Sequence, residues 1–551
     1  MTERTILWFR KGLRLGDSPA LVEALKGNPK HLLPIFVLDP WFANPARVCG
    51  NRYNFLLESL KDLDTSLRSR GSRLIVLRGK APDALTEAAK RWKATRICFE
   101  SDIEPYARKR DSQLRASATG AGIDVSEVSG HTLFAPEHLS ARAQQNGKAV
   151  LPATYEAFRA LVRQMPPPPR PVVAPAALPP VLPEQEGGPP DNAAHGVPPS
   201  VADCGGGYSQ EDVTTRYVGE GGETKARARL ASVMSQERRP WLEAFSKPDT
   251  SPTALEPSTT LLSPHLKFGT LGVREFWWEL EDALTAARKA GRRPSEPPVS
   301  LQGQLLWREF FYSQAATIGS YDKMVGNKAC RQFDWDHSAD LLDAWEHSRT
   351  GYPFIDAAMT QLRTEGWMHH LARHSVACFL TRGDLYQSWE QGARVFDKYL
   401  LDADWAINNG NWMWLSASAY FHQYYRVYSP VAFPKKTDPN GDYIRKFLPQ
   451  FKDFPKEYIY EPWKAPLAVQ QRCGVVVGTT YPRRVVEHET ASKENIARHK
   501  QAFEEARGAG AAGGGGGHGD ADSKKRAHSS SSSSSSSSSK VAGHGKAKIV
   551  K

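Results

Sequence analysis

A long stretch rich in proline and glycine divides the sequence into two halves of different periodicity. It runs from Pro166 to about Gly207 and includes PPPPRPVVAPAALPPVLPEQEGGPP, a composition too rich in these residues to build a core. Before it, short β-rich apolar runs alternate with helical patterns, and after it the helical period is sustained. Because 551 residues exceed what one core usually organises, we expect two domains joined by an extended linker.

The N-terminal half predicts an α/β domain with a doubly wound, Rossmann-like parallel sheet. Its apolar runs are TILWFR, LLPIFVL, RLIVLR, TRICF and IDVSEV, over residues 5–10, 32–38, 73–78, 95–99 and 123–128. Helical patterns such as NRYNFLLESLKDLDTSLRSRG lie between them, and this alternation is typical of parallel sheets. Neither GxGxxG after the first run nor GxxxxGK[ST] occurs, so this half has no usual nucleotide signature.

The same patterns suggest domain boundaries. We expect an α/β domain over residues 1–135, a linker over 136–214, an all-helical domain over 215–495 and a tail over 496–551. The tail contains a glycine run followed by the uninterrupted serines 529–539. Such a composition cannot bury enough apolar surface to offset the entropy of ordering, so the tail should be disordered.

Composition narrows the functional classes. A net charge of +12 favours contact with a polyanion such as nucleic acid. Basic residues in linkers and tail, on a protein whose surface binds no polyanion, would give the same net charge. The six cysteines form no CxxC pair, which argues against a disulfide framework or a zinc site. No run of about 18 apolar residues predicts a membrane span, and the N-terminus lacks the apolar block of a secretory signal. We therefore expect an intracellular protein without membrane contact.

The stretch EGWMHHLARHSVACFL, residues 365–380, concentrates imidazoles on a predicted helix. The apolar face of that helix comprises Trp367, Leu371, Val376 and Phe379. His370 and His374 are four residues apart and so share one face, with His369 and Arg373 beside them. They could be hydrogen-bonded core histidines, metal ligands without the glutamate of HExxH or an obvious third ligand, or acid–base groups. Spacing alone does not choose among these.

Two further stretches suggest a ligand pocket. In LLDADWAINNGNWMWLSAS, residues 400–418, carboxylates and amides alternate with tryptophans, as in a pocket for a flat heteroaromatic ligand. The alternative is a loop whose tryptophans cover the core. In STTLLSPHLKFGTLG, residues 258–272, hydroxyls precede a new helix, which suits a phosphate or a plain N-cap.

Several motifs, in matching order, resemble the cryptochrome/photolyase family. They are WFRKGLRLGDSPAL, LSPHLKFG, QLLWREFFY, GYPFIDAAM, GWMHHLARH and DWAINNGNWMWLSAS. The resemblance extends from about residue 4 to residue 490 and is greatest to the branch that contains (6-4) photolyases and the animal-like cryptochromes of green algae.

The resemblance implies an FAD cofactor, folded into a U in the helical domain. It implies that Arg373 pairs with Asp402 near the isoalloxazine, that Asp404 lies over its polar edge, and that Asn408 faces N5, which favours a flavin that can be fully reduced. The remaining positions matched to the cofactor are Lys247, Thr259, Thr260, Leu261, Leu262, Ser263, Gln304, Trp307, Arg308 and His370.

The resemblance also implies a chain of electron donors behind the flavin. Trp412, Trp389 and Trp335 match its three tryptophans, since indole can be oxidised by photoexcited flavin and stepwise hopping separates the charges. Tyr386, three residues before Trp389 and expected on the same helix face, resembles the terminal donor of the algal subgroup. A surface tyrosine without a redox role is the alternative.

In front of the flavin, Gln304 and His370 match the (6-4) pattern rather than that of cyclobutane-dimer enzymes. The resemblance makes His370 the proton donor to the lesion and His374 the residue that sets its hydrogen bonding. Gln304, Trp414 and Tyr428 would line the same pocket. Photoexcited reduced FAD would lend an electron to a (6-4) lesion flipped out of UV-damaged double-stranded DNA, and the electron would return after repair.

Other expectations are less specific. Lys435, Lys436, Arg445 and Lys446 would bind DNA phosphates or form a solvated loop. The run Lys524, Lys525 and Arg526 is either a nuclear signal or a basic stretch without a role, and DNA repair would place the protein in the nucleus, with the cytoplasm or an organelle as alternatives. An antenna pigment, 8-hydroxy-deazaflavin or a folate, would contact Arg52 and Asp102. We expect a monomer. A second function, a photoreceptor that signals to partners through flavin redox state and the tail, is compatible with the first. A nicotinamide oxidoreductase is disfavoured because no second nucleotide fingerprint occurs.

Overall fold

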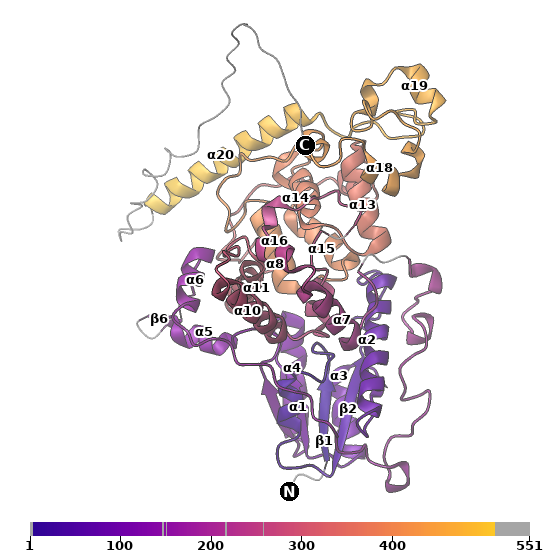
Figure 1. Cartoon of the computed structure of the whole chain (residues 1–551), viewed down its shortest axis with the longest axis vertical. Coiled ribbons are helices and arrows are strands. Elements are labelled where there is room, and N and C mark those ends of the chain that lie inside the picture. Colours follow the sequence, from indigo (N-terminus) through magenta and orange to yellow (C-terminus); the bar gives the residue numbers. More distant parts are fainter. Residues whose placement is uncertain (1–3, 146–147, 150, 215–217, 257, 513–551) are drawn as a thin grey trace, which may run out of the picture. The chain divides into compact units, whose positions relative to one another are not determined.

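The computed structural model describes residues 4–145, 148–149, 151–214, 218–256 and 258–512. Residues 1–502 form one compact unit, which contains both the sheet and the helical bundle. Figure 1 shows the elements of the N-terminal sheet in indigo and the helices that follow in magenta to orange. None of the described helices is long and apolar enough to cross a membrane.

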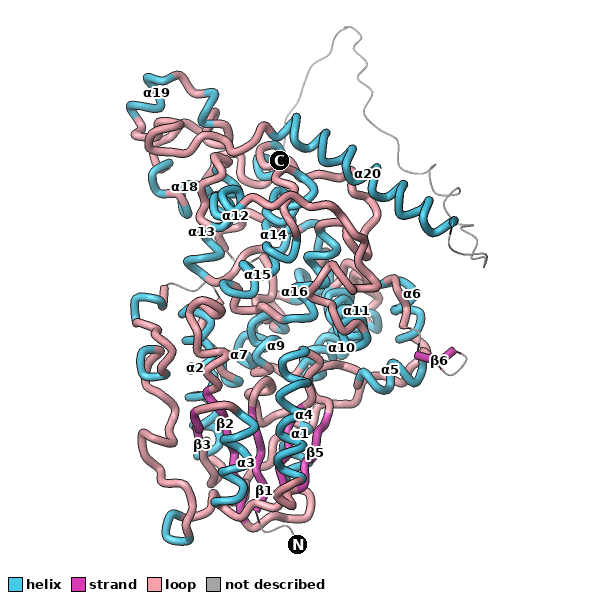
Figure 2. Tube along the Cα trace, turned by 180° about the vertical axis from the view of Figure 1, so that it is seen from behind, coloured by secondary structure: helices cyan, strands magenta, loops and turns pink. Residues whose placement is uncertain are grey.

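Five parallel strands form the sheet (Figure 2). They are β1 (Arg4–Phe9), β2 (His31–Leu38), β3 (Ile75–Arg78), β4 (Arg96–Glu100) and β5 (Asp124–Val128), in the order β3-β2-β1-β4-β5. Ile6 of β1 lies opposite Leu33 of β2 on one side and Ile97 of β4 on the other. The α/β prediction is confirmed, and the strands lie within a few residues of the predicted runs.

Helices cover both faces of this sheet. Leu7 and Phe9 pack under α1 (Pro19–Ala24) and α2 (Gly50–Arg68), whereas Ile6 and Trp8 pack under α3 (Ala81–Arg91) and α4 (Pro105–Thr119). Successive side chains of a strand point to opposite faces, so both faces of β1 must be apolar. This explains why the sequence showed continuous rather than alternating apolar runs.

The segment predicted as a linker packs against both parts of the fold: its helices α5 and α6 contact the helical region, and the extended part that follows them contacts the sheet domain. Residues 136–165 contain α5 (Pro136–Arg142), β6 (Gln144–Gln145), β7 (Lys148–Ala149) and α6 (Tyr155–Val162). Residues 166–214 are extended, with short 3₁₀ turns, yet they bury Leu178, Leu182, Val201, Cys204 and Tyr208 in the two cores beside the sheet. The sequence predicted a partly extended linker too rich in proline and glycine to build a core, and the structure adds that its apolar residues are buried in the cores beside the sheet. Prolines make it extended, and the apolar residues between them are still buried.

The helical region begins at residue 223. Its longer helices are α7 (Glu223–Met234), α10 (Val273–Lys289), α11 (Leu301–Thr317), α12 (Ala339–Glu346), α13 (Pro353–Glu365), α14 (His370–Cys378), α15 (Trp389–Tyr399), α16 (Trp405–Leu415) and α20 (His488–Ala512). Shorter ones are α8 (Arg239–Ala244), α9 (Ser263–Phe268), α17 (Ala432–Lys435), α18 (Asp442–Phe447) and α19 (Leu467–Arg472). The first part of the predicted tail, residues 496–512, continues α20, and residues 513–551 lie outside the described residues.

The histidine-rich stretch is not one helix from residue 365. Helix α13 ends at Glu365, and Gly366 adopts a left-handed conformation with φ 65°, which glycine tolerates because it has no Cβ. Helix α14 then begins at His370, and the Nδ1 atom of His369 accepts a hydrogen bond from Leu371 N at 3.1 Å. His369 is therefore an N-cap, and Trp367 precedes the helix whose face it was expected to share.

Candidate active site

Helices α14 and α16 bring four of the predicted pocket residues together. The ring centroids of His370 and His374 are 5.9 Å apart, and the His374 ring lies 5.5 Å from that of Trp414. The hydroxyl of Tyr428 lies 3.4 Å from His374 Nδ1. The four-residue spacing therefore does place both imidazoles on one face, beside an aromatic wall contributed by a different part of the chain.

The His370 ring is oriented by a segment that sequence reasoning did not single out for it. Its Nε2 atom lies 3.2 Å from the carbonyl oxygen of Lys247 and 3.5 Å from the hydroxyl of Thr250. Thr250 directly follows the 3₁₀ turn Lys247–Asp249. No sequence motif predicts the contact of Thr250 with His370, because the two residues are 120 positions apart in the chain.

Burial keeps both histidines neutral. It is the main cause that lowers the pKa of His370 and His374 well below 6.5, and the nearby Lys247 ammonium lowers both further. A neutral imidazole has one N–H donor and one acceptor nitrogen. An anionic group in the pocket would raise both pKa values, since a neighbouring negative charge favours the protonated form. The pair is thus suited to proton exchange with a bound anion.

A second cluster lies next to these histidines on α14. The Arg373 guanidinium makes a two-pronged ion pair with Asp402, with nitrogen–oxygen distances of 3.1 and 2.9 Å. The Ser263 hydroxyl donates to the same carboxylate at 2.7 Å. Three positions matched to the cofactor are therefore in contact, as the resemblance implied for Arg373 and Asp402.

The same cluster has more positive than negative charge. Burial, followed by the Arg373 charge, lowers the pKa of Lys247 to about 8, and no carboxylate among the described residues lies within 4.0 Å of its ammonium. The buried hydroxyl of Ser258 also has no hydrogen-bond partner there. An unneutralised cation and a free hydroxyl fit the diphosphate of a dinucleotide. Residues 259–263 lead from this hydroxyl into α9, with Leu261 held at φ 56°.

Two other cofactor positions, Asp404 and Asn408, use polar atoms for hydrogen bonds within the fold. Asp404 caps α16: its Oδ1 accepts from Ala406 N and Ile407 N at 3.1 Å, and its Oδ2 accepts from the Tyr312 hydroxyl. Asn408 donates through Nδ2 to the Ala393 carbonyl at 2.9 Å. The buried Tyr312, which sequence reasoning missed, thus holds the start of the helix that carries Asn408.

The three candidates on α11 are held by local contacts. Gln304 donates to the Pro298 carbonyl at 3.1 Å, and Trp307 stacks on Tyr155 with centroids 3.9 Å apart. Arg308 pairs with Glu309 at 3.2 Å. Among the described residues, no hydrogen bond or ring contact joins these side chains to His370.

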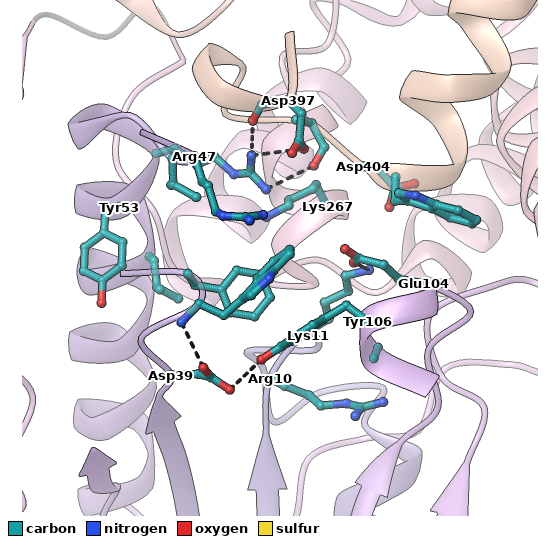
Figure 3. A pocket seen from close by; sticks show the side chains of 18 of the residues that line it. Arg10, Lys11, Asp39, Arg47, Tyr53, Glu104, Tyr106, Lys267, Asp397 and Asp404 are labelled. Atoms are coloured by element: carbon teal, nitrogen blue, oxygen red, sulfur yellow. Dashed lines mark hydrogen bonds and ion pairs between the residues drawn. The ribbon is translucent and has the colours of Figure 1, made fainter. Parts of the chain in front are cut away.

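A cavity of about 620 Å³ opens where the carboxyl ends of the strands meet the helical region (Figure 3). Asp404 and Lys267 line it from the helical side, and both antenna candidates, Arg52 and Asp102, line it from the sheet domain. Lys11 pairs with Asp102 at 2.8 Å, while burial raises the pKa of Glu104 to about 7. Ligands of open α/β sheets bind in this position.

The aromatic series predicted as electron donors begins on α16 with Trp412 and consists of buried residues. Trp412, Trp389, Trp335 and Tyr386 are all at most 3% exposed, and the rings of Trp335 and Tyr386 are 4.8 Å apart. A Cβ added to Gly392 of α15 would come within 2.2 Å of the Trp412 ring, so only glycine lets the helices pack this closely. Tyr386 precedes α15, with φ 52°, so its expected place on the helix face of Trp389 was wrong.

The structure also bears on two other interpretations, the metal-site alternative for the histidines and the basic cluster of Lys435, Lys436, Arg445 and Lys446. The described residues contain no group of three side chains that could hold a metal ion, so nothing there completes a site around His370 and His374. In the basic cluster, Lys435 pairs with Glu461 at 3.0 Å and Lys446 lies 3.6 Å from Glu365, which leaves less net charge than the sequence suggested. Lys524, Lys525 and Arg526 lie outside the described residues.

Comparisons with known proteins match both halves of the chain. Residues 300–501 match the model of the FAD binding domain of DNA photolyase, and residues 5–175 match the model of DNA photolyase. A (6-4)DNA photolyase of Oryza sativa subsp. japonica is 47% identical over 89% of this chain and 88% of its own length. Cryptochrome-2 of Gallus gallus is 45% identical over 91% of this chain and 84% of its own.

Solved structures show the same fold. A cryptochrome of Synechocystis sp. PCC6803 superposes with a TM-score of 0.76 at 26% identity, over 91% of this chain and 99% of its own. A bacterial class III photolyase from Agrobacterium tumefaciens superposes with a TM-score of 0.73 at 26% identity, over 92% of this chain and 98% of its own. The chain therefore carries an FAD-binding helical domain and a photolyase-type sheet domain.

Proposed function

Because this chain belongs to the DNA photolyase and cryptochrome family, we propose that it is a light-driven (6-4) DNA photolyase. The observation that carries the proposal is the cluster of His370, His374, Trp414 and Tyr428 next to the Arg373–Asp402 pair. It offers a proton-exchanging face directly beside the residues suited to hold FAD. The relatives named (6-4)DNA photolyase support the lesion class.

The chain holds and orients the reactants. Lys247, Ser258 and residues 259–263 would bind the diphosphate, and Arg373 with Asp402 would fix the ring side of the cofactor. Bound FAD, when reduced and photoexcited, supplies the electron that the lesion accepts and later returns. All other steps are proton movements and positioning by side chains.

His370 is the proton donor in this scheme. Negative charge on the bound lesion and its phosphates would raise the pKa of the adjacent imidazoles, so the His370–His374 pair would take up one proton from solvent, and His370 would pass it to the oxygen that must migrate. Thr250 and the Lys247 carbonyl orient His370, while Tyr428 orients His374. Trp414 offers an aromatic face for the flipped base.

The partner is UV-damaged double-stranded DNA, with Lys436 and Arg445 as phosphate contacts beside the paired Lys435 and Lys446. Binding should weaken with salt because counterions are released. The chain acts as a monomer in the nucleus. The cavity lined by Arg52, Asp102 and Lys267 would take an antenna pigment, an 8-hydroxy-deazaflavin or a folate, since its aromatic and cationic lining suits a flat anionic ring system.

A second candidate function is light signalling through flavin redox state. The contact of Trp335 with Tyr386 extends the aromatic series beyond three tryptophans, and cryptochromes are among the relatives. Partner proteins would then bind the C-terminal tail and respond to the redox state of the flavin. One electron chain can serve both roles.

The test is illumination of the reduced holoprotein with a (6-4) duplex and with a cyclobutane-dimer duplex. We expect repair of the first only. His370→Ala should lower that repair about 100-fold or more, the usual contribution of a general acid, while flavin content stays unchanged. His347→Ala, at a half-exposed histidine paired with Asp343, is the matched control. Normal flavin photoreduction without repair of either duplex would reject the lyase in favour of the photoreceptor.

A further inference from the structure

Successive carbonyl oxygens at the end of α16 are bound by basic residues from three other segments. Helix α16 carries Asn408, Trp412 and Trp414. The contacts are Leu415 O with Arg382 Nε at 2.8 Å, Ser416 O with His499 Nε2 at 3.2 Å, Ala417 O with Arg331 Nη1 at 3.4 Å, and Ser418 O with Arg331 N at 2.7 Å. Carbonyls at a helix C-terminus carry partial negative charge, so cations stabilise them.

The chain that leaves this helix end is strained. Ala417 and Tyr420 adopt φ values of 60° and 64°, a conformation that is unfavourable for residues other than glycine. Such a conformation persists only where surrounding contacts impose it. The segment then runs to Phe421 and on to Tyr428, whose hydroxyl faces His374. The strained turn therefore decides where the aromatic wall of the pocket stands.

Arg382 is the more buried of the two arginines that hold this turn. It is 1% exposed, and it binds the segment twice, through Nε to Leu415 O and through Nη1 to Tyr424 O at 2.7 Å. No carboxylate of the described residues lies within 4.0 Å of it. An apolar side chain would fill that space at lower cost, because a buried charge without an ionic partner is expensive.

Ring contacts connect this guanidinium with the histidines. Its central carbon lies 5.5 Å from the Phe421 ring, Phe421 lies 4.4 Å from Trp414, and Trp414 lies 5.5 Å from His374. Arg382 itself belongs to the π-helical turn Phe379–Gly383, which continues directly from α14. The backbone that presents His370 and His374 thus also presents the residue that holds the opposite wall.

We propose that Arg382 is a positioning residue for repair: it fixes the Trp414–Tyr428 wall against His374 and places a permanent positive charge behind that histidine. The role rests on the proposed function and goes beyond it, since Arg382 touches neither cofactor nor lesion. Holding the wall would govern how well the flipped base is bound. The charge would govern the pH at which His374 becomes protonated.

Several charged or titratable groups act on His374, and Arg382 is one of them. They are Lys247, His369, His370, Arg373, Arg382 and Tyr428. Burial is the main cause that lowers the His374 pKa, and Lys247 and His369 contribute before Arg382. Removing the Arg382 charge should therefore raise that pKa in part. A second proton on the pair, which leaves His374 without an acceptor nitrogen, would then bind and inactivate the pair at a higher pH.

The test separates charge from hydrogen bonding with two substitutions. Arg382→Gln keeps donors for a carbonyl but removes the charge, whereas Arg382→Lys keeps the charge but cannot reach both carbonyls at once. With the (6-4) duplex, Arg382→Gln should raise KM about tenfold, the factor for one lost charged hydrogen bond, and move the acidic limb of the pH profile upward. Arg382→Lys should restore the limb without restoring KM. Flavin content and photoreduction should not change.

Arg70→Gln is the matched control, because Arg70 also binds backbone carbonyls, of Pro175 and Ser66, far from the pocket. Wild-type KM and pH profile in a folded Arg382→Gln protein would overturn the proposal. If Arg382→Gln does not fold, Arg331→Gln is measured instead, at the half-exposed arginine that binds the same turn. This variant must raise KM and leave the pH profile unchanged. An unchanged KM would overturn the proposal. If the wild type repairs no (6-4) duplex, the proposed function fails by itself. The His374 pKa, followed by NMR, then decides: an upward change in Arg382→Gln or, if that variant does not fold, in the equally uncharged Arg382→Met, with no change in Arg382→Lys, supports the role, and no change in the uncharged variant refutes it.

Discussion

The two sides of α16 are built on opposite principles. On the histidine side, the imidazoles of His370 and His374 each have a polar partner from another segment. On the tryptophan side, the buried indole N–H groups of Trp412 and Trp335 have no hydrogen-bond partner among the described residues. Proton transfer requires donors and acceptors in fixed orientation. Electron transfer between rings depends on their proximity, so dry aromatic packing suffices and unpaired N–H groups are tolerated.

The substitution with the largest expected effect is at Trp412, on the tryptophan side of α16. Trp412→Phe should abolish photoreduction of oxidised flavin, since phenyl is much harder to oxidise than indole, while pre-reduced protein should repair DNA nearly as well as the wild type. Absorbance during illumination and product analysis measure the two activities. Trp345→Phe is the control: Trp345 lies 6.1 Å from Trp412 but donates its N–H to the Val376 carbonyl. Equal photoreduction in both variants would reject the assigned route.

A smaller effect is expected for the ion pair between Arg373 and Asp402 on the histidine side. Asp402→Asn breaks the ion pair with Arg373 and leaves a largely buried guanidinium uncompensated. The free energy of unfolding of flavin-free protein should fall by about 3 kcal/mol, near the lower limit for buried pairs because Arg373 keeps some exposure. Urea denaturation measures it. Asp343→Asn breaks the exposed pair with Arg349 and should cost less than about 1 kcal/mol; equal losses would contradict the assigned burial.

The smallest effect concerns His499, which touches the tryptophan side from α20. Its ring lies 5.5 Å from Trp335 and 5.4 Å from Tyr386, and burial lowers its pKa to about 4. The unfolded chain then binds a proton below about pH 6.5 that the folded chain refuses, so this residue makes stability fall as pH drops from about 6.5 to 4.

His499→Gln should remove that loss, which amounts to on the order of 1–2 kcal/mol at pH 5. Urea unfolding of wild type and variant at pH 7 and pH 5 measures the difference. His347→Gln, at a half-exposed histidine, should leave the pH dependence as in the wild type. A wild-type slope in His499→Gln would show that α20 is not docked through a neutral imidazole.

Local periodicity was enough to predict the sheet and the existence of the helices. Continuous apolar runs between helical patterns place β1 to β5 within a few residues of where they lie, because burial on both sheet faces leaves its mark on every residue of a strand. Breaks between elements were less visible. The left-handed Gly366 and the N-cap at His369 divide a stretch whose composition is helical throughout.

The sequence by itself determined the kind of chemistry. The paired histidines and the Asp–Asn–Trp stretch predict titratable groups and a pocket for a flat heteroaromatic ligand, and the resemblance of the ordered motifs to the cryptochrome/photolyase family implies a flavin protein that handles light and DNA. Only the tertiary structure decided how these groups act. Tyr428 contacts His374, 54 positions away in the chain, and Lys247 contacts His370, 123 positions away. Arg382 donates a hydrogen bond to a strained turn that no sequence motif predicts. Residue types and short spacings are local properties of the chain, whereas burial, partner choice and the resulting pKa values depend on segments that meet only when the chain folds.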